Sequence, residues 1–394
     1  MRVHHRGTAT WVFALILCWT LCMSVNAQSI RHQGTWNNST FGSSGSLQFD
    51  TQVTGGNVTM TFKQGGNAFG AGEAPAVTLN GTIGANGITF TKTGDPRYGD
   101  VTINIGLDGA LSFRFDRIPV SGIQREEATG NMTANAISFD FTIFFTNGST
   151  ARGTGTATRV SGSLPSPLFF GQFGNGGGIT SDVVLPNPSN KTIGGTAVFA
   201  DDNGNPLTVG IATVAKTGEP VASFAAQNRV DFSVPPLGSV RISTDGLGGV
   251  VAGSAVVLSE DLLGGIIRFF LPGIGIAGVG QSRPLSSFII PVRRKAGGIN
   301  TGVALRSTSS KPVTISLSLR RGTQEVAATS LANFPAGGHL ARFIDQIFTN
   351  VNTDDFEGTL VVRVTGGQVA ATALELGSLP GQFTTLPVTA LTSP

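Results

Sequence analysis

Oxygen-bearing side chains alternate along residues 201–205, with the sequence DDNGN. Asp201, Asn203 and Asn205 stand at alternate positions, the spacing with which a calcium-binding loop presents its oxygen ligands. An EF-type loop also needs a glycine at its sixth position and a glutamate at its twelfth, where this chain has proline and alanine. A hairpin turn through Asn203 and its glycine neighbour explains the run more simply, so we expect no bound metal there.

Side chains that could form a nucleophilic site are few. Beyond residue 27 the only histidines are His32 and His339, and the sequence has no G-x-S-x-G motif. Both cysteines, Cys18 and Cys22, fall within the first 27 residues, so the rest of the chain offers no disulfide and no thiol for catalysis or zinc. The glycine motif at 273–278 follows a proline and precedes no predicted helix, unlike a dinucleotide site. We therefore expect a protein that is not an enzyme and needs no cofactor.

Carboxylates are the exception, because 23 acidic residues leave room for the site of a glycan-active enzyme. Such a site needs two carboxylates about 5 to 9 Å apart in a groove. It commonly carries aromatic platforms for sugars as well, yet beyond residue 27 the chain has a single Trp, Trp36, and a single Tyr, Tyr98. Because recognition surfaces favour Trp and Tyr, a glycan-active enzyme is the third of our hypotheses.

The first 27 residues have the features of a secretory signal. Arg2 and Arg6 precede an apolar stretch at residues 11–25 that is too short to span a bilayer, and a small-residue cleavage site ends at Ala27. We expect cleavage after Ala27, a secreted, extracellular or envelope location, and no transmembrane segment in the mature chain. Without the two leader arginines, 24 basic residues (26 − 2) face 23 acidic ones, a net charge of +1. That balance argues against nucleic-acid binding.

Glycine-rich hairpins dominate the next part of the chain. The chain has 55 Gly and only 12% charged residues, which is typical of β-structure with many tight turns. Apolar and polar residues alternate between residues 47 and 158, most clearly at 137–145, and Asn-Gly or Asp-Gly pairs separate the segments. A meander of about eight or nine strands hides its edges best by closing, so we predict an up-and-down β-barrel or a meander sandwich over residues 28–160.

Gly34-Thr35-Trp36, near the start of this segment, resembles the G-x-W opening of lipocalin and avidin-type barrels, in which the Trp closes one end of the barrel. The resemblance covers this one short motif, and a core Trp of some other β-fold is the simpler alternative. It implies a barrel whose interior could carry a small apolar ligand, our second hypothesis for function. The candidate interior residues are Trp36, Phe49, Phe90, Phe113, Phe139 and Phe141.

A tandem repeat organises the remaining part of the chain. After a Ser/Pro-rich linker at 161–167, residues 177–199 return as residues 297–319 with seven identical positions and no gap. Later landmarks are 100 rather than 120 residues apart, so the first copy holds about 20 extra residues. About seven short strands per copy predict two immunoglobulin-like β-sandwich domains, at 168–282 and 283–394.

The two copies resemble sandwich repeats of uncharacterised secreted bacterial proteins, which share a Phe- and Gly-rich opening strand, an Asn-Pro-Ser turn and an Asp-Asp-x-Gly hairpin. Here these features are residues 169–178, 187–189 and 201–204, and the second copy has lost the last two. The resemblance implies an extracellular location and no activity. One short helix is predicted at residues 339–349, where apolar residues at helical spacing form one stripe.

Our first hypothesis is therefore a secreted, non-enzymatic, all-β protein with a structural or adhesive role in the cell envelope or outside the cell. Its partner is unknown. The hypothesis rests on the signal, the duplication and the lack of a catalytic constellation in the sequence. A ligand-carrying barrel is the alternative, and the state of the barrel interior, hollow or filled by Phe, distinguishes the two.

Overall fold

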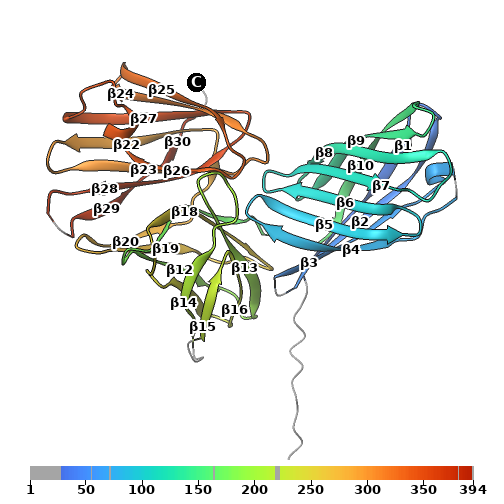
Figure 1. Cartoon of the computed structure of the whole chain (residues 1–394), viewed down its shortest axis with the longest axis horizontal. Coiled ribbons are helices and arrows are strands. Elements are labelled where there is room, and N and C mark those ends of the chain that lie inside the picture. The colour runs from blue at the N-terminus through green and yellow to red at the C-terminus, as the bar shows by residue number, and fades with distance from the viewer. Residues whose placement is uncertain are drawn as a thin grey trace, which may run out of the picture.

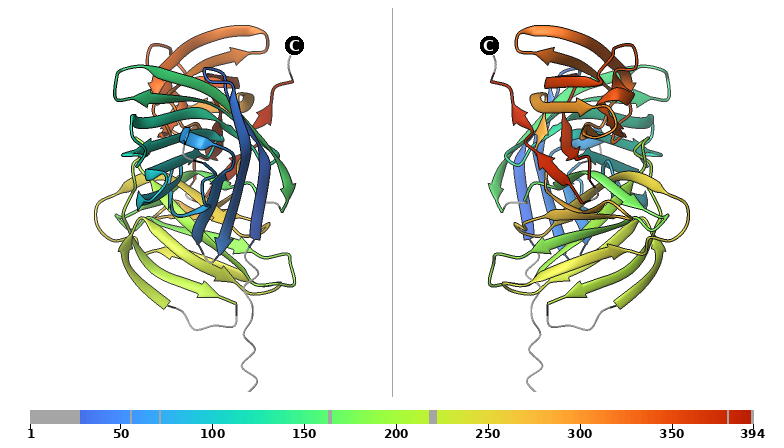
Figure 2. Two further views of the ribbon diagram at one scale, coloured as in Figure 1. Left: turned by 90° about the vertical axis from the view of Figure 1, so that its right-hand side faces the viewer. Right: turned by 90° about the vertical axis from the view of Figure 1, so that its left-hand side faces the viewer.

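The computed structural model describes residues 28–54, 56–70, 72–162, 165–217, 222–379 and 381–392, so the predicted signal and its cleavage site lie outside the described residues. Within these ranges the chain is all-β, as predicted. Figure 1 shows a barrel on one side and two further strand-built domains beside it. In Figure 2 the barrel lies in front in one view and the C-terminal strands lie in front in the other. No helix in these ranges is long and apolar enough to cross a membrane.

The barrel is a closed sheet of antiparallel strands, because β1 pairs with both β2 and β10. Every other pairing joins neighbours in sequence, which makes this an up-and-down barrel and decides between the two predicted alternatives, barrel and meander sandwich. A short 3-10 helix, η1 (Ala68–Gly70), lies in the connection between β3 and β4. The strands are β1 (Gln28–Asn38), β2 (Ser43–Thr54), β3 (Asn57–Gln64), β4 (Val77–Gly84), β5 (Gly87–Asp95), β6 (Gly99–Gly106), β7 (Ala110–Asp116), β8 (Ile123–Met132), β9 (Ala136–Phe145) and β10 (Thr150–Ser161).

Large and small side chains face each other inside the barrel. The inward residues of β9 are large, whereas those of β10 are alanine or glycine. Phe139 lies opposite Gly155, and Phe141 lies opposite Gly153. A Cβ atom at Gly155 would lie 2.2 Å from a ring carbon of Phe139, and a Cβ atom at Gly153 would lie 2.3 Å from a ring carbon of Phe141. The glycines of β10 therefore make room for the rings that fill the barrel.

The meander gives the barrel two different ends, because every second turn lies at the same end. The turns at one end contact the other two domains through Gly56, Ala85, Asn86 and Asp108, and we call it the docked end. At the opposite end, which we call the open end, turns join β1 to β2, β3 to β4, β5 to β6, β7 to β8 and β9 to β10. Figure 1 shows the docked end facing the other domains, with the short helical turn η1 far from them.

The second domain has two sheets that enclose one apolar core. The first sheet has the order β11-β18-β13-β16, and the second has the order β15-β14-β17-β12-β19-β20. Side chains from both sheets, among them Phe170, Phe199 and Ile242, form one buried cluster. The strands are β11 (Leu168–Asn175), β12 (Thr180–Pro186), β13 (Ile193–Ala200), β14 (Val209–Lys216), β15 (Ala222–Gln227), β16 (Arg229–Val234), β17 (Ser239–Thr244), β18 (Val251–Ser259), β19 (Ile266–Leu271) and β20 (Gly275–Gly280).

The third domain connects its strands in the order β21-β28-β23-β22-β27-β24-β25, with β26 paired to β23, β29 to β28 and β30 to β22. Phe288, Leu305 and Leu360, which come from β22, β23 and β27, belong to one buried core. The strands are β21 (Pro284–Leu285), β22 (Ser287–Lys295), β23 (Asn300–Ser307), β24 (Val313–Arg321), β25 (Gln324–Phe334), β26 (His339–Phe343), β27 (Asp355–Thr365), β28 (Val369–Leu376), β29 (Phe383–Leu386) and β30 (Thr389–Ala390).

The two C-terminal domains pair their strands in the same way. β11 pairs with β18 as β22 pairs with β27, and β12 pairs with β17 and β19 as β23 pairs with β26 and β28. β13 likewise pairs with β16 and β18 as β24 pairs with β25 and β27. β14 and β15 have no counterpart in this scheme among the described strands, and they lie where the first copy is longer. The sequence repeat thus corresponds to a repeat of strand pairing.

The helix predicted at residues 339–349 is a single turn. His339–Phe343 form strand β26, and α1 covers only Ile344–Ile347. The backbone of β26 pairs with β23 along its whole length, and a backbone group that bonds across a sheet is not available for a helix. Part of the predicted apolar stripe is buried nonetheless, because Ile344 and Phe348 belong to the core of the third domain.

A buried arginine joins all three domains at the docked end. Arg306 of β23 is fully buried, and its guanidinium donates to the Ala85 carbonyl of the barrel, the Ser254 hydroxyl of the second domain and the Ser307 carbonyl of its own domain. The ring of Phe169 lies 5.6 Å from the guanidinium carbon. Burial lowers the pKa of Arg306 to about 9, so the side chain remains cationic at neutral pH.

Further polar contacts fix the turns of the docked end. The Asp108 carboxylate accepts from the backbone N–H and the hydroxyl of Ser310, at 2.7 and 3.0 Å. Asn86 donates to the Gly204 carbonyl at 3.2 Å. One turn of the barrel is thereby bonded to the third domain and another to the second, so the barrel is held against both.

Candidate functional site

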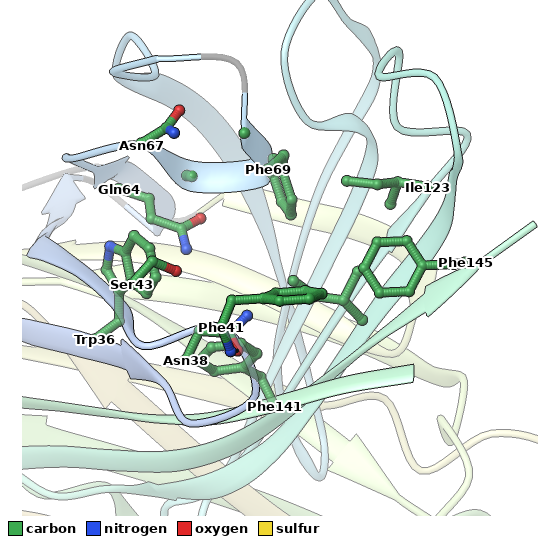
Figure 3. A pocket seen from close by; sticks show the side chains of 13 residues that line it. Trp36, Asn38, Phe41, Ser43, Gln64, Asn67, Phe69, Ile123, Phe141 and Phe145 are labelled. Carbon is green, nitrogen blue, oxygen red and sulfur yellow. The ribbon is translucent and has the colours of Figure 1, made fainter. Parts of the chain in front are cut away.

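The open end of the barrel contains a pocket of about 320 Å³. This volume lies at the lower limit for ligand pockets and would hold about ten water molecules at liquid density. Figure 3 shows aromatic rings and amide side chains around a common space. The described lining contains no charged side chain, and it consists of Trp36, Asn38, Phe41, Ser43, Gln64, Asn67, Ala68, Phe69, Gly70, Ile123, Phe141, Ile143 and Phe145.

Trp36 forms one wall of the pocket and is held from two directions. Its Nε1–H donates to the Gly65 carbonyl at 2.9 Å, and its ring meets that of Phe141 edge to face, with 6.5 Å between centroids. Gly45 lies close to the indole, where a Cβ atom would come within 2.5 Å of Nε1. The single polar atom of the indole is used within the barrel, so Trp36 presents an apolar surface to the pocket.

Phe69 enters the pocket from η1 with an unusual backbone conformation. Its φ of 60° lies in the left-handed region, which is uncommon for an aromatic residue. Arg97 holds this loop by donating to the carbonyls of Ala68 and Gly72, and Asn67 accepts from the Gly72 N–H at 2.7 Å. Strain of this kind costs about 1–3 kcal/mol and concentrates at functional sites.

Two amide side chains line the pocket with hydrogen-bonding capacity left unused. Gln64 is 6% exposed, and its Oε1 has no hydrogen-bond partner in the described part of the chain. Asn38 uses its Oδ1 to accept from the N–H groups of Thr40 and Phe41, at 3.0 and 3.1 Å, whereas its amide nitrogen donates to no described group. A buried polar group without a partner costs about 1–3 kcal/mol. These two amides can therefore bond a guest molecule without giving up a bond within the protein.

Phe41 and Phe145 stand side by side at the edge of the pocket. Phe41, in the turn between β1 and β2, is 65% exposed, and its ring meets that of Phe145 edge to face with 6.0 Å between centroids. Most other large apolar side chains of the barrel are buried. An uncovered ring next to a pocket enlarges the apolar area that a guest could bury.

Glu126 lies inside the barrel, near the open end of β8. It is 3% exposed and lies opposite Ile143 of the pocket, and its Oε2 has no hydrogen-bond partner among the described residues. Burial raises the pKa of this carboxyl to about 8, so it is mostly protonated at pH 7. Burial also raises the pKa of Tyr98 to about 12. Both groups are then neutral, which keeps this part of the interior free of charge.

The six residues predicted for the barrel interior divide between the pocket and the core. Trp36 and Phe141 line the pocket. The other four are packed deeper, and the ring centroids lie 4.8 Å apart between Phe113 and Phe139 and 5.9 Å apart between Phe49 and Phe113. These core residues are Phe49, Phe90, Phe113 and Phe139. Rings fill the centre of the barrel, and the space that remains is at the open end.

The polar part of the pocket was missed by the sequence analysis, although one signal was present. Gln64 continues the inward alternation of Val58, Met60 and Phe62 on β3, so its position indicates a polar side chain that points into the barrel. Phe145 likewise continues the alternation of residues 137–145, whereas Phe41 and Phe69 come from turns, where no alternation guides the prediction. The lining residues missed in this way include Asn38, Phe41, Gln64, Phe69 and Phe145.

The candidate calcium residues form a hydrogen-bonded turn. The Asp201 carboxylate accepts from the N–H groups of Asn203 and Asn205, at 2.9 and 2.8 Å. In the described ranges no group of three or more His, Cys, Asp or Glu is placed to hold a metal ion. The next carboxylate, Asp202, lies 2.8 Å from Nδ1 of His339 in the third domain. The loop therefore takes part in the contact between these two domains.

The two histidines considered as general bases lie in different surroundings. His32 is fully buried inside the barrel, and neither ring nitrogen makes a hydrogen bond within normal limits to a described residue, although backbone groups of Thr133 and Ala134 lie near the ring. His339 uses both ring nitrogens, because its Nε2 lies 3.1 Å from Oε1 of Gln172. Burial is the main cause that lowers the pKa of both imidazoles. In the described part of the chain, neither imidazole is hydrogen-bonded to a serine hydroxyl.

Comparison with known proteins adds little to this geometry. No family model matches the chain, and no curated protein matches it. A solved structure described as "Structure of PNGF-II in C2 space group" is 8% identical, with 93% of this chain and 99% of that chain covered and a TM-score of 0.15. A TM-score this low carries no argument about fold or function. The functional interpretation therefore depends on the site itself.

Proposed function

We propose that this protein is a non-enzymatic binding protein that holds a small, mainly apolar molecule in the pocket at the open end of its barrel. The observation that carries the proposal is the composition and place of the pocket. Its walls are aromatic and aliphatic, its few polar groups are uncharged, and it lies at the end of the barrel away from the other domains. Ligand sites in proteins commonly combine these features.

This proposal moves the carrier hypothesis ahead of the structural one and changes its site. The interior rings Phe49, Phe113 and Phe139 are in contact with one another, so we place the ligand at the end of the barrel and not in its centre. A guest in the pocket would cover the exposed ring of Phe41 and contact the strained Phe69. Binding would thus remove apolar area of both rings from water, which favours the bound state.

Filling the pocket with a protein side chain tests the proposal. Ser43 lines the pocket, whereas its neighbour Ser44 on β2 is exposed on the outside. We expect the wild-type protein to bind 4-fluorotoluene, seen as concentration-dependent broadening of its ¹⁹F resonance. Ser43→Trp should abolish this broadening, and the matched variant Ser44→Trp should keep it. No broadening with the wild type, or broadening that survives Ser43→Trp, would contradict the proposal.

We further propose that the chain is secreted after removal of residues 1–27 and that the second and third domains are immunoglobulin-like sandwiches related by duplication. The common pattern of strand pairing supports the duplication, and the two-sheet core of the second domain suits a sandwich. In this arrangement the C-terminal domains hold the docked end and leave the open end free. Amino-terminal sequencing of the secreted protein should begin at Gln28.

A structural or adhesive role is the second candidate, and one observation favours it. Apolar side chains are exposed together on the outer face of β19 and β20, where Phe270 lies directly opposite Ile276. Exposed apolar groups close together mark interaction surfaces. Phe270→Ser with Ile276→Ser should lower adsorption to an alkyl-coated sensor severalfold, whereas Leu262→Ser, at another exposed apolar position, should not. Equal adsorption of both variants would remove the support.

A further inference from the structure

We propose that the ligand of the open-end pocket is a neutral, planar molecule with an amide-type edge, an N–H group beside a carbonyl, that pairs with the side chain of Gln64. The proposal rests on the binding function proposed above and names the class of its ligand. It follows from two observations. The side-chain amides of Gln64 and Asn38 have hydrogen-bonding groups without partners in the described ranges, and the rest of the lining disfavours a charged ligand.

Gln64 offers a complete and unused hydrogen-bonding edge. Its Oε1 is buried without a partner among the described residues, and its Nε2 donates to none of them. Its backbone N–H is held by the Tyr98 hydroxyl at 3.1 Å, so the base of the side chain is fixed. In a carboxamide the acceptor oxygen and the donor nitrogen lie side by side. A ligand with the complementary N–H and carbonyl satisfies both at once, whereas an ester or a ketone satisfies only the donor.

Asn38 adds a second donor to the same space. Its Oδ1 is occupied by the N–H groups of Thr40 and Phe41, which fixes the side chain and the turn that carries the exposed ring. Its amide nitrogen is left over and lines the pocket together with Gln64. A carbonyl oxygen has two lone pairs, so a ligand carbonyl that accepts from one of these amides keeps a lone pair for a second donor. The pocket thus favours a ligand with a carbonyl over one with donors alone.

The rest of the lining restricts charge and shape. The described lining contains no Lys, Arg, His, Asp or Glu, and an ion buried without a partner is strongly disfavoured. The nearby Glu126 is itself neutral at pH 7 because burial raises its pKa to about 8. Aromatic rings account for much of the wall, and flat apolar molecules make the largest contact with such rings. A volume of about 320 Å³ limits the ligand to a small ring system.

A ligand series with a constant ring tests the inference. The probes are 4-fluorobenzamide, methyl 4-fluorobenzoate, the 4-fluorobenzoate ion and 4-fluorotoluene, each titrated by ¹⁹F NMR against the full-length protein. We expect 4-fluorobenzamide to bind about tenfold more tightly than the ester, because the ester has no N–H group and leaves the buried Oε1 of Gln64 without a hydrogen bond. The carboxylate ion should bind most weakly. Gln64→Leu should remove the preference for the amide and leave 4-fluorotoluene at least as well bound, while Gln33→Leu, at an exposed glutamine of β1, should change neither.

The outcomes separate this inference from the proposed function. If the amide and the ester bind the wild type equally, and neither binds the Ser43→Trp variant, the pocket binds ligands but the inference about Gln64 is wrong. If no probe binds, the proposed function itself fails. The comparison of probes with the wild type decides between these results even if Gln64→Leu does not fold.

Discussion

The two ends of the barrel treat buried polar groups in opposite ways. At the docked end, the Ala85 carbonyl accepts from Arg306, the Asp108 carboxylate accepts from Ser310, and Asn86 donates to a carbonyl of the second domain. Of these docked-end groups Ala85 and Arg306 are buried, whereas Asn86 and Asp108 are exposed. Toward the open end, Gln64 and Glu126 are buried like Arg306, and yet each has a polar atom without a partner in the described ranges. Both ends belong to one meander, so the difference lies in what each end contacts.

This difference indicates which polar residues serve the fold and which serve a ligand. A buried polar group that is fully bonded strengthens a unique arrangement, whereas an unbonded one costs stability. The docked end pairs its groups because the positions of the second and third domains depend on them. The open end retains unbonded polar groups that lower its stability, as expected of a site whose hydrogen-bond partner is a bound ligand. Each prediction below removes or alters one of these groups.

The largest effect is expected at the docked end, for Arg306→Ala. The substitution leaves the Ala85 and Ser307 carbonyls and the Ser254 hydroxyl without their donor and opens a cavity where the guanidinium lay. We expect a loss of about 3 kcal/mol or more in the free energy of unfolding. In differential scanning calorimetry the barrel should then unfold separately from the other two domains, whereas the wild type should unfold in fewer, more cooperative steps.

The matched control for this experiment is Arg293→Ala. Arg293 forms an ion pair with Glu375 at 2.7 Å on the surface of the third domain, and such exposed pairs contribute about 0–1 kcal/mol. If Arg306→Ala costs no more than Arg293→Ala, the junction does not hold the domains together, and the contrast between the two barrel ends loses its basis.

The second largest effect is expected for Glu126→Gln, and it has the opposite sign. The folded protein holds a proton on Glu126 up to about pH 8, whereas the unfolded chain releases it near the ordinary value of 4.5. The free energy of unfolding therefore falls as pH rises through this window. Glutamine cannot ionise, so the variant should gain a few kcal/mol over the wild type at pH 9, at about 1.4 kcal/mol for each pKa unit, and little at pH 5.

Urea denaturation at pH 5 and pH 9 measures this difference. The control is Glu127→Gln, because Glu127 is the next residue on β8 but points outward and pairs with Arg114 and Arg125, both at 2.8 Å. Its substitution should lower stability slightly and give no gain at pH 9. Equal pH profiles for the wild type and Glu126→Gln would mean that the carboxyl is not held neutral in the barrel.

The contrast between the barrel ends also shows how far the sequence could be used to predict this molecule. The meander of strands was predictable, with a closed barrel as one of two alternatives, because alternation along strands such as residues 137–145 and the glycine turns between them are local properties. The bonding of Arg306 was not. Its partners, Ala85 and Ser254, are far from it in sequence and belong to other domains, so no local pattern connects them.

The pocket was not predictable for a related reason. The sequence placed Phe49 and Phe113 inside the barrel, but whether rings fill a barrel or line a cavity depends on side-chain volumes across strands that are distant in sequence. For β26, the local spacing of apolar residues favoured a helix. The repeat held the better evidence, because its counterpart β17 carries a strand pattern from Ser239 to Thr244 and pairs with β12 as β26 pairs with β23.

A smaller effect is expected for His32→Leu. His32 lies toward the docked end, where it is fully buried and, like the Thr51 hydroxyl, makes no hydrogen bond within normal limits to a described residue. Backbone groups of Thr133 and Ala134 lie close enough to the ring to raise its pKa in part. Burial lowers its pKa below the ordinary value of 6.5, so the wild type loses stability as pH falls through that value and toward the folded pKa. The variant should be about 1 kcal/mol more stable than the wild type at pH 5. Urea midpoints at pH 5 and pH 8 check this, and a variant less stable at both would show that the imidazole is bonded in solution.

The smallest effect is expected for Asp202→Asn, which tests whether charge matters in the contact between the second and third domains. The Asp202 side chain is 69% exposed, and asparagine keeps an oxygen that can accept from Nδ1 of His339. The pKa of His339 is lowered mainly by burial and is raised by Asp202, so losing the negative charge lowers that pKa further. A lowered folded pKa means that stability present above the unfolded value of 6.5 is lost on acidification. The variant should therefore match the wild type at pH 8 and be less stable by under about 1 kcal/mol at pH 5. If Asp202→Asn lowered the free energy of unfolding as much as Arg306→Ala, the charge of Asp202 would stabilise the domain contacts as strongly as the hydrogen bonds of Arg306, contrary to our expectation.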